Sequence, residues 1–334
     1  MPATVVFLIT GASRGLGRAI AKVAGKHYAQ KNKLNGSAVP AYSKARFLLV
    51  ARSSKDTEDT KKEILSVAKN TALSLTSPTS TAINPDDILC RSMDLSDLDR
   101  LDSNIDVLLK DFDKLCSQER NGTEKQQQQQ QQQQQRMIFI NNAGSLGYLG
   151  PSWESPSLED MRQTIDFNVT SSLWLSVRFA RYIKEIELQQ QQSYQERNNP
   201  PIKTGTSTPT PSATIVNISS LVAVSKDFPG MGIYSAGKAA REMYHALVAK
   251  DEDQATEAET ECLNAILLKT LNYAPGPLET TMTQEIRDSD GLDEDLQSNF
   301  QTKLLDPEDS ARKLIELLDT NEFESGSHID YYDL

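Results

Sequence analysis

A glycine-rich segment near the start of the chain limits the folds that this sequence can adopt. Residues 9–17 read ITGASRGLG and lie between an apolar run, Val5–Ile9, and a segment with helical patterning, Gly15–Tyr28. A strand, a tight turn and a helix in this order let the backbone approach a pyrophosphate, which the N–H groups at the helix N-terminus can bind. The glycines alone are weak evidence, and it is their place between strand and helix that predicts a dinucleotide site.

The alternation of strand and helix continues along the whole chain. Apolar strands that alternate with helices predict a parallel sheet covered on both faces, so we expect an α/β fold: one doubly wound, Rossmann-type domain over residues 1–334 with about seven parallel strands. Strands are predicted at Val5–Ile9, Arg46–Val50, Ile88–Met93, Met137–Ile140, Thr214–Ile218 and Leu267–Tyr273, with a short last one that includes Ile329. Helices are predicted at Gly15–Tyr28, Asp56–Ala68, Leu98–Leu115, Phe167–Glu187, Tyr234–Ala249 and Pro307–Leu318.

Low-complexity segments interrupt this alternation, each between a helix and the next strand. They lie at about residues 30–45, 71–87, 118–136, 189–212 and 250–261, and the third contains the glutamine run Gln126–Gln135. In a doubly wound sheet such connections lie at the amino ends of the strands, whereas ligands bind at the carboxyl ends. We interpret them as solvated inserts rather than partner sites, which explains a hydrophobic content of only 38% without a second domain.

Charge and cysteine usage exclude several classes of protein. The formal net charge is −11 and no block of Lys and Arg is present, which argues against nucleic acid or an anionic membrane as a partner. The cysteines Cys90, Cys116 and Cys262 are scattered and lack metal-ligand spacing, so we expect no metal site and no disulfide framework. With no signal-peptide pattern and no bilayer-length apolar run, a cytoplasmic location is expected.

The expected cofactor is NADPH rather than NADH. The loop residues Gly11, Ala12, Ser13, Arg14, Gly15, Leu16 and Gly17 are assigned to cofactor binding. NAD sites usually place an acid after the second strand to bind the ribose hydroxyls, but here Arg52 and Ser53 follow it. Two guanidinium groups, from Arg14 and Arg52, suit the 2′-phosphate of NADPH/NADP+.

Two further strand ends carry residues that suit a dinucleotide. The third predicted strand ends in MDLSD, where Asp94, followed by Leu95, can accept a hydrogen bond from the adenine amino group. The fourth ends in NNAG, where small residues beside Asn142 let the backbone approach the cofactor. Each signal is weak alone, and both lie at the predicted carboxyl edge of the sheet.

The catalytic candidates follow the fifth predicted strand. NISS ends at Ser220, and YSAGK places Tyr234 and Lys238 four residues apart, on one face of a helix. A tyrosine has an ordinary pKa near 10, and we expect the Lys238 cation, with the nicotinamide of the cofactor close by, to lower it so that Tyr234 can give a proton to a carbonyl oxygen. Ser220 would bind the same oxygen, Lys238 would also hold the cofactor ribose, and Asn168 could support a proton-relay water.

Taken together, these motifs resemble the short-chain dehydrogenase/reductase family. The motifs are TGASRGLG, NNAG, NVTSS, the serine of NISS, YSAGK and the PG that follows the sixth strand, and the resemblance covers the chain apart from the five inserts. It implies an NADPH-dependent carbonyl reductase that dimerises through Phe167–Glu187 and Tyr234–Ala249. The interval from Ser220 to Tyr234 is one residue longer than is usual in the family, which leaves Ser219 as an alternative catalytic serine.

Within this family, the C-terminal segment EFESGSHIDYYDL is similar to that of members that reduce pterins. This resemblance implies that Asp330 anchors a pterin through the ring 2-amino and N–H groups, and that the backbone of Gly276 lies close to the substrate. It also implies that residues 278–283 cover the cofactor, with Leu278, Thr280 and Met282 in contact with it.

Two other functions remain compatible with these residues. The first is a general NADPH-dependent carbonyl reductase, for which Asp330 has no special role. The second is a non-catalytic NADPH-binding scaffold whose glutamine-rich inserts bind partners. The sequence leaves open which pterin is used, which keto group is reduced first, the oligomeric state and the role of the inserts.

Overall fold

A computed structural model describes residues 3–31, 42–73, 83–117, 135–195, 212–258, 266–301 and 304–334. Seven parallel strands form one sheet in the order β3-β2-β1-β4-β5-β6-β7, which confirms the predicted doubly wound fold. The strands are β1 (Ala3–Thr10), β2 (Tyr42–Ala51), β3 (Ile88–Ser92), β4 (Gln135–Asn141), β5 (Ser212–Ile218), β6 (Leu267–Ala274) and β7 (His328–Asp330). Each contains or overlaps a predicted strand.

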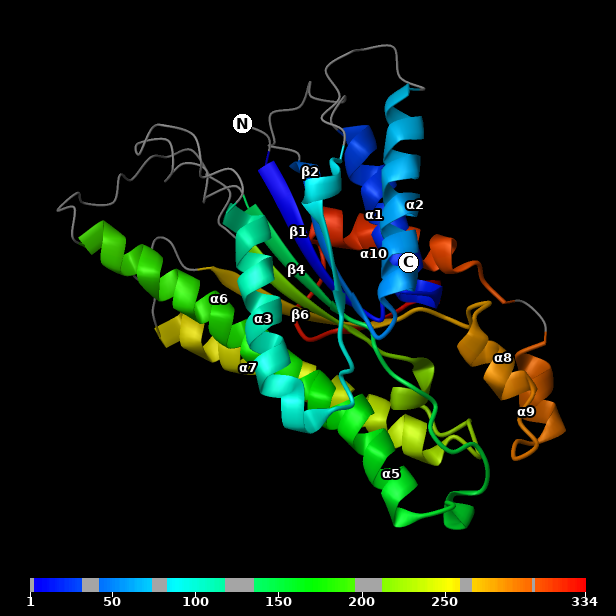
Figure 1. Cartoon of the computed structure of the whole chain (residues 1–334). Helices are drawn as coiled ribbons and strands as arrows, with labels where there is room; N and C mark the ends of the chain where they lie inside the picture. Colours follow the sequence, from blue (N-terminus) through cyan, green and yellow to red (C-terminus); the bar gives the residue numbers. More distant parts are fainter. Residues whose placement is uncertain are drawn as a thin grey trace.

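Helices cover both faces of the sheet. Helices α1, α2 and α10 lie on one face, and α3, α6 and α7 lie on the other (Figure 1). The bounds are α1 (Gly15–Lys31), α2 (Ser54–Leu73), α3 (Leu98–Ser117), α5 (Leu158–Ile165), α6 (Ser172–Gln195), α7 (Gly232–Ala258), α8 (Thr281–Arg287), α9 (Glu294–Asn299) and α10 (Pro307–Thr320). Within the described ranges, none of these helices is long and apolar enough to cross a membrane.

The alternation of side chains along β1 shows why the sheet is buried on both sides. Val5, Phe7 and Ile9 pack into the core formed with α1, α2 and α10, whereas Val6 and Leu8 pack into the core formed with α3 and α6. Successive side chains of a strand point to opposite faces, so a strand with helices on both sides is apolar at most positions, and in β1 Thr4 and Thr10 are buried as well.

The predicted inserts fall largely outside the described residues. Gln126–Gln135 lies outside them except for Gln135, the first residue of β4. Where the structure describes the start of an insert, it finds helix, since α6 continues to Gln195 and α7 to Ala258. The single-domain assignment and the insert boundaries stay predictions.

Three short helices, α5, α8 and α9, have no counterpart in the sequence prediction. Each has eight residues or fewer, too few to display a helical period, and end caps help to define two of them. Ser157 Oγ accepts the amide of Asp160 at the start of α5, and Thr280 caps α8 by accepting from Thr283. All three lie beyond the carboxyl ends of the strands (Figure 1), so they extend the sheet edge where ligands bind.

Candidate active site

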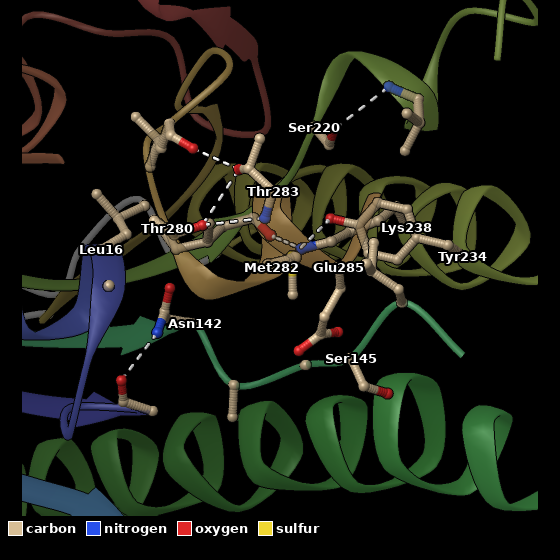
Figure 2. Close-up of a pocket in the computed structure, with 18 of the residues that line it drawn as sticks. Leu16, Asn142, Ser145, Ser220, Tyr234, Lys238, Thr280, Met282, Thr283 and Glu285 are labelled. Atoms are coloured by element: carbon tan, nitrogen blue, oxygen red, sulfur yellow. Dashed lines mark hydrogen bonds between the residues drawn. The ribbon is translucent and has the colours of Figure 1, made fainter. Parts of the chain in front are cut away.

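A single cavity of about 1680 Å³ opens at the carboxyl ends of the strands. The strand order reverses between β1 and β4, and in open parallel sheets this switch point forms the ligand crevice. Most residues assigned from the sequence line it, from distant parts of the chain (Figure 2). They are Gly11, Ser13, Arg14, Gly15, Leu16, Arg52, Ser53, Leu95, Asn142, Ser220, Tyr234, Lys238, Gly276, Leu278, Thr280, Met282 and Asp330.

The turn after β1 can be built only with glycines. A Cβ on Gly17 would lie 2.3 Å from the carbonyl oxygen of Gly11, and one on Gly11, whose φ is +65°, would lie 2.7 Å from Asn142 Nδ2. The Asn142 amide in turn donates to Thr10 O at 3.0 Å, which joins the ends of β1 and β4. Gly17 therefore acts by close packing and not as a lining residue. Ala12 is also away from the cavity, buried with its carbonyl accepting from Thr60 Oγ1 at 3.0 Å.

Two exposed arginines mark one end of the cavity. Arg14 and Arg52 both line it beside Ser53, in agreement with their proposed role at a 2′-phosphate, and Asp56 lines the same end. Asp94 is not among the lining residues. Its carboxylate accepts from the amide of Ser96 at 3.0 Å and from its hydroxyl at 2.7 Å, which lowers the pKa of Asp94.

The hydroxyls of the two candidate serines have different partners. Ser220 borders the cavity, and its hydrogen bond with Tyr234 partly opposes the rise in the pKa of that tyrosine. The Ser220 Oγ also accepts from the amide of Val222 at 3.4 Å. Ser219 is 2% exposed, and its hydroxyl donates to the carboxylate of Glu242. The geometry therefore favours Ser220 as the serine beside the reacting group.

Tyr234 and Lys238 lie on one face of α7, as their spacing predicts, and both are buried. Lys238 Nζ donates to Ile218 O at 2.6 Å and lies 5.6 Å from the centre of the Tyr234 ring. Tyr234 Oη lies 3.9 Å from Met282 Sδ, which brings the start of α8 against the phenol. The tyrosine, the lysine and α8 thus enclose the middle of the cavity.

The pKa of Tyr234 is shifted in the direction opposite to the one expected. Burial raises it to about 12, and only in part do Arg241 and the Ser220 hydroxyl counteract this. Burial, reinforced by the nearby Arg241, also lowers the pKa of Lys238 well below its ordinary value. The expectation of a lysine cation that favours the phenolate overlooked how strongly burial disfavours charge on both groups. In the protein alone, Tyr234 is a neutral phenol, which is the form that donates a proton.

Asn168 does not line the cavity. It lies in a π-helical turn, Asp166–Ser171, at the start of the predicted long helix. Its Oδ1 accepts from the amide of Ser145 at 2.8 Å and its Nδ2 donates to the carbonyl of Ser145 at 2.8 Å, so the side chain is held against the loop after β4. Such single π-turns are frequent at functional sites because they change the direction of a helix carbonyl. Any role of Asn168 in a water relay therefore falls to its backbone.

Arg241 is a site residue that the sequence interpretation missed. It is 1% exposed, and its guanidinium donates to Asn217 Oδ1 at 2.8 Å, to Ala143 O at 3.1 Å and to Asn141 O at 2.5 Å. It thereby joins α7 to the ends of β4 and β5. The available signal was its position three residues after Lys238, on the same helix face.

The other end of the cavity is apolar and was also missed. A separate hydrophobic cluster brings together Leu146, Val222, Met231, Tyr234, Ile286, Leu292 and Leu296, with Phe228, Met282 and Phe300 packed against it. These residues come from the loop after β4, the segment before α7 and the start of α7, and helices α8 and α9 with the loop between them. No local pattern identifies them, because they contact one another only in the folded chain.

The C-terminal segment closes this end. Asp330, the last residue of β7, accepts from the amide of Tyr332 at 2.9 Å and caps a 3-10 turn at Tyr331–Asp333. Lys313 Nζ holds the turn by donating to Tyr331 O at 2.9 Å and Leu334 O at 2.8 Å. Gly276, with φ of +76°, lies between β6 and α8 on the wall of the same cavity.

Comparison with solved structures identifies the class of fold. Levodione reductase covers 98% of this chain and 95% of its own, with a TM-score of 0.63 and 16% identity. A 7α-hydroxysteroid dehydrogenase complexed with NADH and a 7-oxo bile acid has a TM-score of 0.61 and 16% identity, covering 98% of this chain and 92% of its own. The fold is that of the short-chain dehydrogenases/reductases.

Among curated proteins, the chain is similar to sepiapterin reductases, which confirms the resemblance seen in its motifs. The bovine (Bos taurus) enzyme is 34% identical over 205 residues, which are 59% of this chain and 62% of that enzyme. The rat (Rattus norvegicus) enzyme is 32% identical over 206 residues, 59% of this chain and 64% of that enzyme. The match thus spans less than two thirds of either relative. A benzil reductase of Bacillus cereus is 27% identical over 195 residues, 57% of this chain and 65% of that enzyme. No family model matches.

Proposed function

We propose that this protein is an NADPH-dependent reductase of the short-chain family that reduces side-chain keto groups of a pterin. Sepiapterin and 6-pyruvoyl-tetrahydropterin are the proposed substrates, in the final steps to tetrahydrobiopterin. One observation carries the proposal: Tyr234 lies in a single cavity that has the glycine turn at one end and Asp330 at the other. The similarity to sepiapterin reductases supports the choice of pterin over other carbonyl compounds.

The residues at the cofactor end fit a dinucleotide phosphate. The glycine turn packs so closely on itself and on Asn142 that a Cβ at Gly11 or Gly17 would collide, and α1 starts at Gly15 beside the cavity, where the first N–H groups of a helix can bind a phosphate. Arg14 and Arg52 would bind the 2′-phosphate, and Thr280 and Leu278 would cover the opposite side. Lys238 would bind the ribose. When bound, NADPH supplies the hydride.

The chain itself supplies the proton. The substrate carbonyl oxygen would accept hydrogen bonds from Ser220 and Tyr234, and Tyr234 would transfer its phenolic proton to that oxygen as negative charge develops there. A phenol with a pKa of about 12 stays protonated at neutral pH, which suits the direction of reduction. Solvent would then reprotonate Tyr234 from the cavity that Lys238 also lines.

The substrate end suits a flat heterocycle with donor groups on one edge. Asp330 would accept from the 2-amino group and ring N–H of a pterin, while the apolar cluster around Met231 and Phe228 would contact the ring faces. Gly276 would allow the backbone to approach the substrate. These contacts would place the side-chain carbonyl beside Tyr234.

A general carbonyl reductase is the second candidate. The apolar substrate end and the similarity to a benzil reductase favour it, because neither requires a pterin. This candidate predicts that Asp330 has no effect on turnover.

We also infer a cytoplasmic homodimer. Leu188 on α6 and Met243 and Leu247 on α7 are each more than half exposed, so these two helices offer an apolar surface for a second copy. Among the described residues, Cys90 and Cys116 form no disulfide, which fits a reducing compartment.

The test is NADPH oxidation with sepiapterin by the full chain, its Asp330→Asn variant and a control, Asp309→Asn, on the exposed side of α10. We expect robust turnover for the wild type and the control, and a KM for sepiapterin raised about tenfold or more in Asp330→Asn, with NADPH affinity unchanged. Turnover of diketones but not sepiapterin, or indifference to Asp330, would favour the general reductase.

A further inference from the structure

Three side chains from separate elements meet at the carboxylate of Glu242. Ser219, which follows β5, donates its hydroxyl to Glu242 Oε2. His328, the first residue of β7, places its Nδ1 2.9 Å from Glu242 Oε1. Glu242 itself lies on α7, one helical turn beyond Lys238. One carboxylate therefore joins the catalytic helix, the segment that carries the catalytic serine and the C-terminal strand.

The side chains of this cluster are largely buried, which strengthens the hydrogen bonds between them. Ser219 is 2% exposed, and the side chains of Glu242 and His328 are 14% and 23% exposed. Hydrogen bonds between charged groups are screened less in such a place than at the open surface. The bond to Glu242 is the first cause that raises the pKa of His328; burial opposes it, while Asp330 and Asp333 act in the same direction as Glu242. From β6, the Asn272 amide donates to the Glu242 backbone carbonyl at 3.3 Å.

The C-terminal strand needs such support because it is short. β7 has three residues and, in the described part of the chain, pairs only with β6, where Asn272, Tyr273 and Ala274 face it. Side chains two residues apart on a strand share a face, so His328 and Asp330 point to the same side. The bond to Glu242 fixes the start of the strand, and Lys313 fixes the turn after it. Asp330 lies between these two attachments.

We propose that Glu242 and His328 are positioning residues that hold Asp330 at a set place relative to Ser220 and Tyr234. The inference rests on the proposed function in one respect, the role of Asp330 as the substrate anchor. The same carboxylate accepts the hydroxyl of Ser219, the residue that directly precedes Ser220. Glu242 therefore contacts both the strand that carries Asp330 and the segment that carries Ser220.

The consequence for catalysis is selective. A substrate held by Asp330 depends on the placement of β7, whereas a small diketone that contacts only Ser220, Tyr234 and the cofactor does not. Loss of the Glu242–His328 bond should therefore weaken binding of the pterin and spare the chemistry of the diketone. A purely structural role in α7 or β5 would impair both substrates alike.

The experiment compares Glu242→Gln, His328→Gln and the double variant with a control, Glu308→Gln. The Glu308 carboxylate accepts from Lys22 Nζ at 2.5 Å, and Glu308 does not line the cavity. For each single variant we expect the KM for sepiapterin to rise about tenfold and kcat/KM for diacetyl to stay within about twofold. The double variant should resemble Glu242→Gln, because His328→Gln removes only a bond that Glu242→Gln already disrupts. The control should match the wild type.

A second readout does not depend on the substrate. Hydrogen exchange, followed by mass spectrometry on peptides covering residues 326–334, should be faster in both single variants and unchanged in the control. In the wild type, the KM for sepiapterin should rise as the pH passes upward through the raised pKa of His328, because the charged pair exists below that pH and is lost above it. In His328→Gln this dependence should disappear.

Three results would overturn the inference: unchanged exchange of the C-terminal peptides, additive effects in the double variant, or equal losses on sepiapterin and diacetyl. A wild-type protein that does not turn over sepiapterin at all refutes the proposed function instead. In that case the exchange data alone decide whether Glu242 and His328 hold the C-terminal strand.

Discussion

The two ends of the cavity are constructed in different ways. The cofactor end, formed by the residues that follow β1, β2 and β4, consists of short turns whose shape is set by backbone contacts such as that between Gly11 and Gly17. The substrate end is assembled from the loops after β4 and before α7, from helices α7, α8 and α9 and from the C-terminal segment, through contacts such as that of Tyr234 with Met282. Substitutions at the cofactor end should therefore hinder NADPH binding and affect every substrate. Substitutions at the substrate end should change the KM by amounts that depend on the substrate.

Removal of the hydroxyl where the two ends meet should have the largest effect. We expect Tyr234→Phe to lower kcat by about 10³-fold with every carbonyl substrate, because it removes the proton donor. The ring is 8% exposed and remains packed, so NADPH affinity, measured by fluorescence titration, should hardly change. The matched control is Tyr244→Phe on the same helix, outside the cavity lining. A variant that keeps a tenth of the wild-type rate would assign proton donation to another group.

The cofactor end should be intolerant of a single methyl group. In Gly17→Ala the new Cβ would lie 2.3 Å from Gly11 O, so α1 or the turn must move, and we expect NADPH affinity to fall about 10- to 100-fold. In the control, Gly25→Ala on the same helix but away from the cavity, the Cβ would lie 2.7 Å from Ile64 Cγ2, so this variant should lose stability and keep its NADPH affinity. Titration of both variants with NADPH checks this. Equal affinities would show that the turn is not a close-packed cofactor site.

The substrate end should respond to a cavity. Ile286 on α8 is 5% exposed and packs in the apolar cluster, so Ile286→Ala should raise the KM for sepiapterin about tenfold while NADPH affinity stays within about twofold. Ile315→Ala on α10 is the control: its core position predicts a loss of about 2–5 kcal/mol in the free energy of unfolding with an unchanged KM. Equal effects of Ile286→Ala on cofactor and substrate would argue that the two ends are not independent.

Cofactor choice should change modestly. Arg52 is exposed and shares the proposed 2′-phosphate site with Arg14, so Arg52→Gln should raise the KM for NADPH roughly fivefold and leave that for NADH unchanged. Lys55→Gln, nearby on α2 but not lining the cavity, serves as the control. Loss of activity with both cofactors would contradict a contact to the phosphate alone.

The smallest effect should be that of pH on kcat. Tyr234 donates as a neutral phenol with a pKa of about 12, so its protonated fraction is constant well below that value and falls only as the pH approaches it. We expect kcat for diacetyl reduction to be flat from about pH 6 to 9. The reverse oxidation, which needs the phenolate, should accelerate as the pH rises. A decline of the reduction rate near neutral pH would mean that the bound cofactor lowers the pKa strongly.

Local patterns were sufficient for the framework of the fold and for the cofactor end. The alternation of apolar runs located every strand that the structure describes, and the order of strand, glycine turn and helix located the end of the cavity where we propose that the dinucleotide binds. Tyr234 and Lys238 were placed together because four residues make about one helical turn. These features depend on neighbours within a few residues, which a sequence displays directly.

What the tertiary structure alone decided depends on burial and on contacts between distant residues. The rise in the pKa of Tyr234 follows from the burial of this residue, which outweighs the opposing effects of Arg241 and Ser220, and the YSAGK motif does not reveal this burial. Ser219 and Ser220 differ because the hydroxyl of Ser219 donates to Glu242, whereas that of Ser220 lies beside Tyr234. The bond from Glu242 to His328 spans 86 residues and exists only because β7 joins the edge of the sheet, which brings the end of the chain to its catalytic helix.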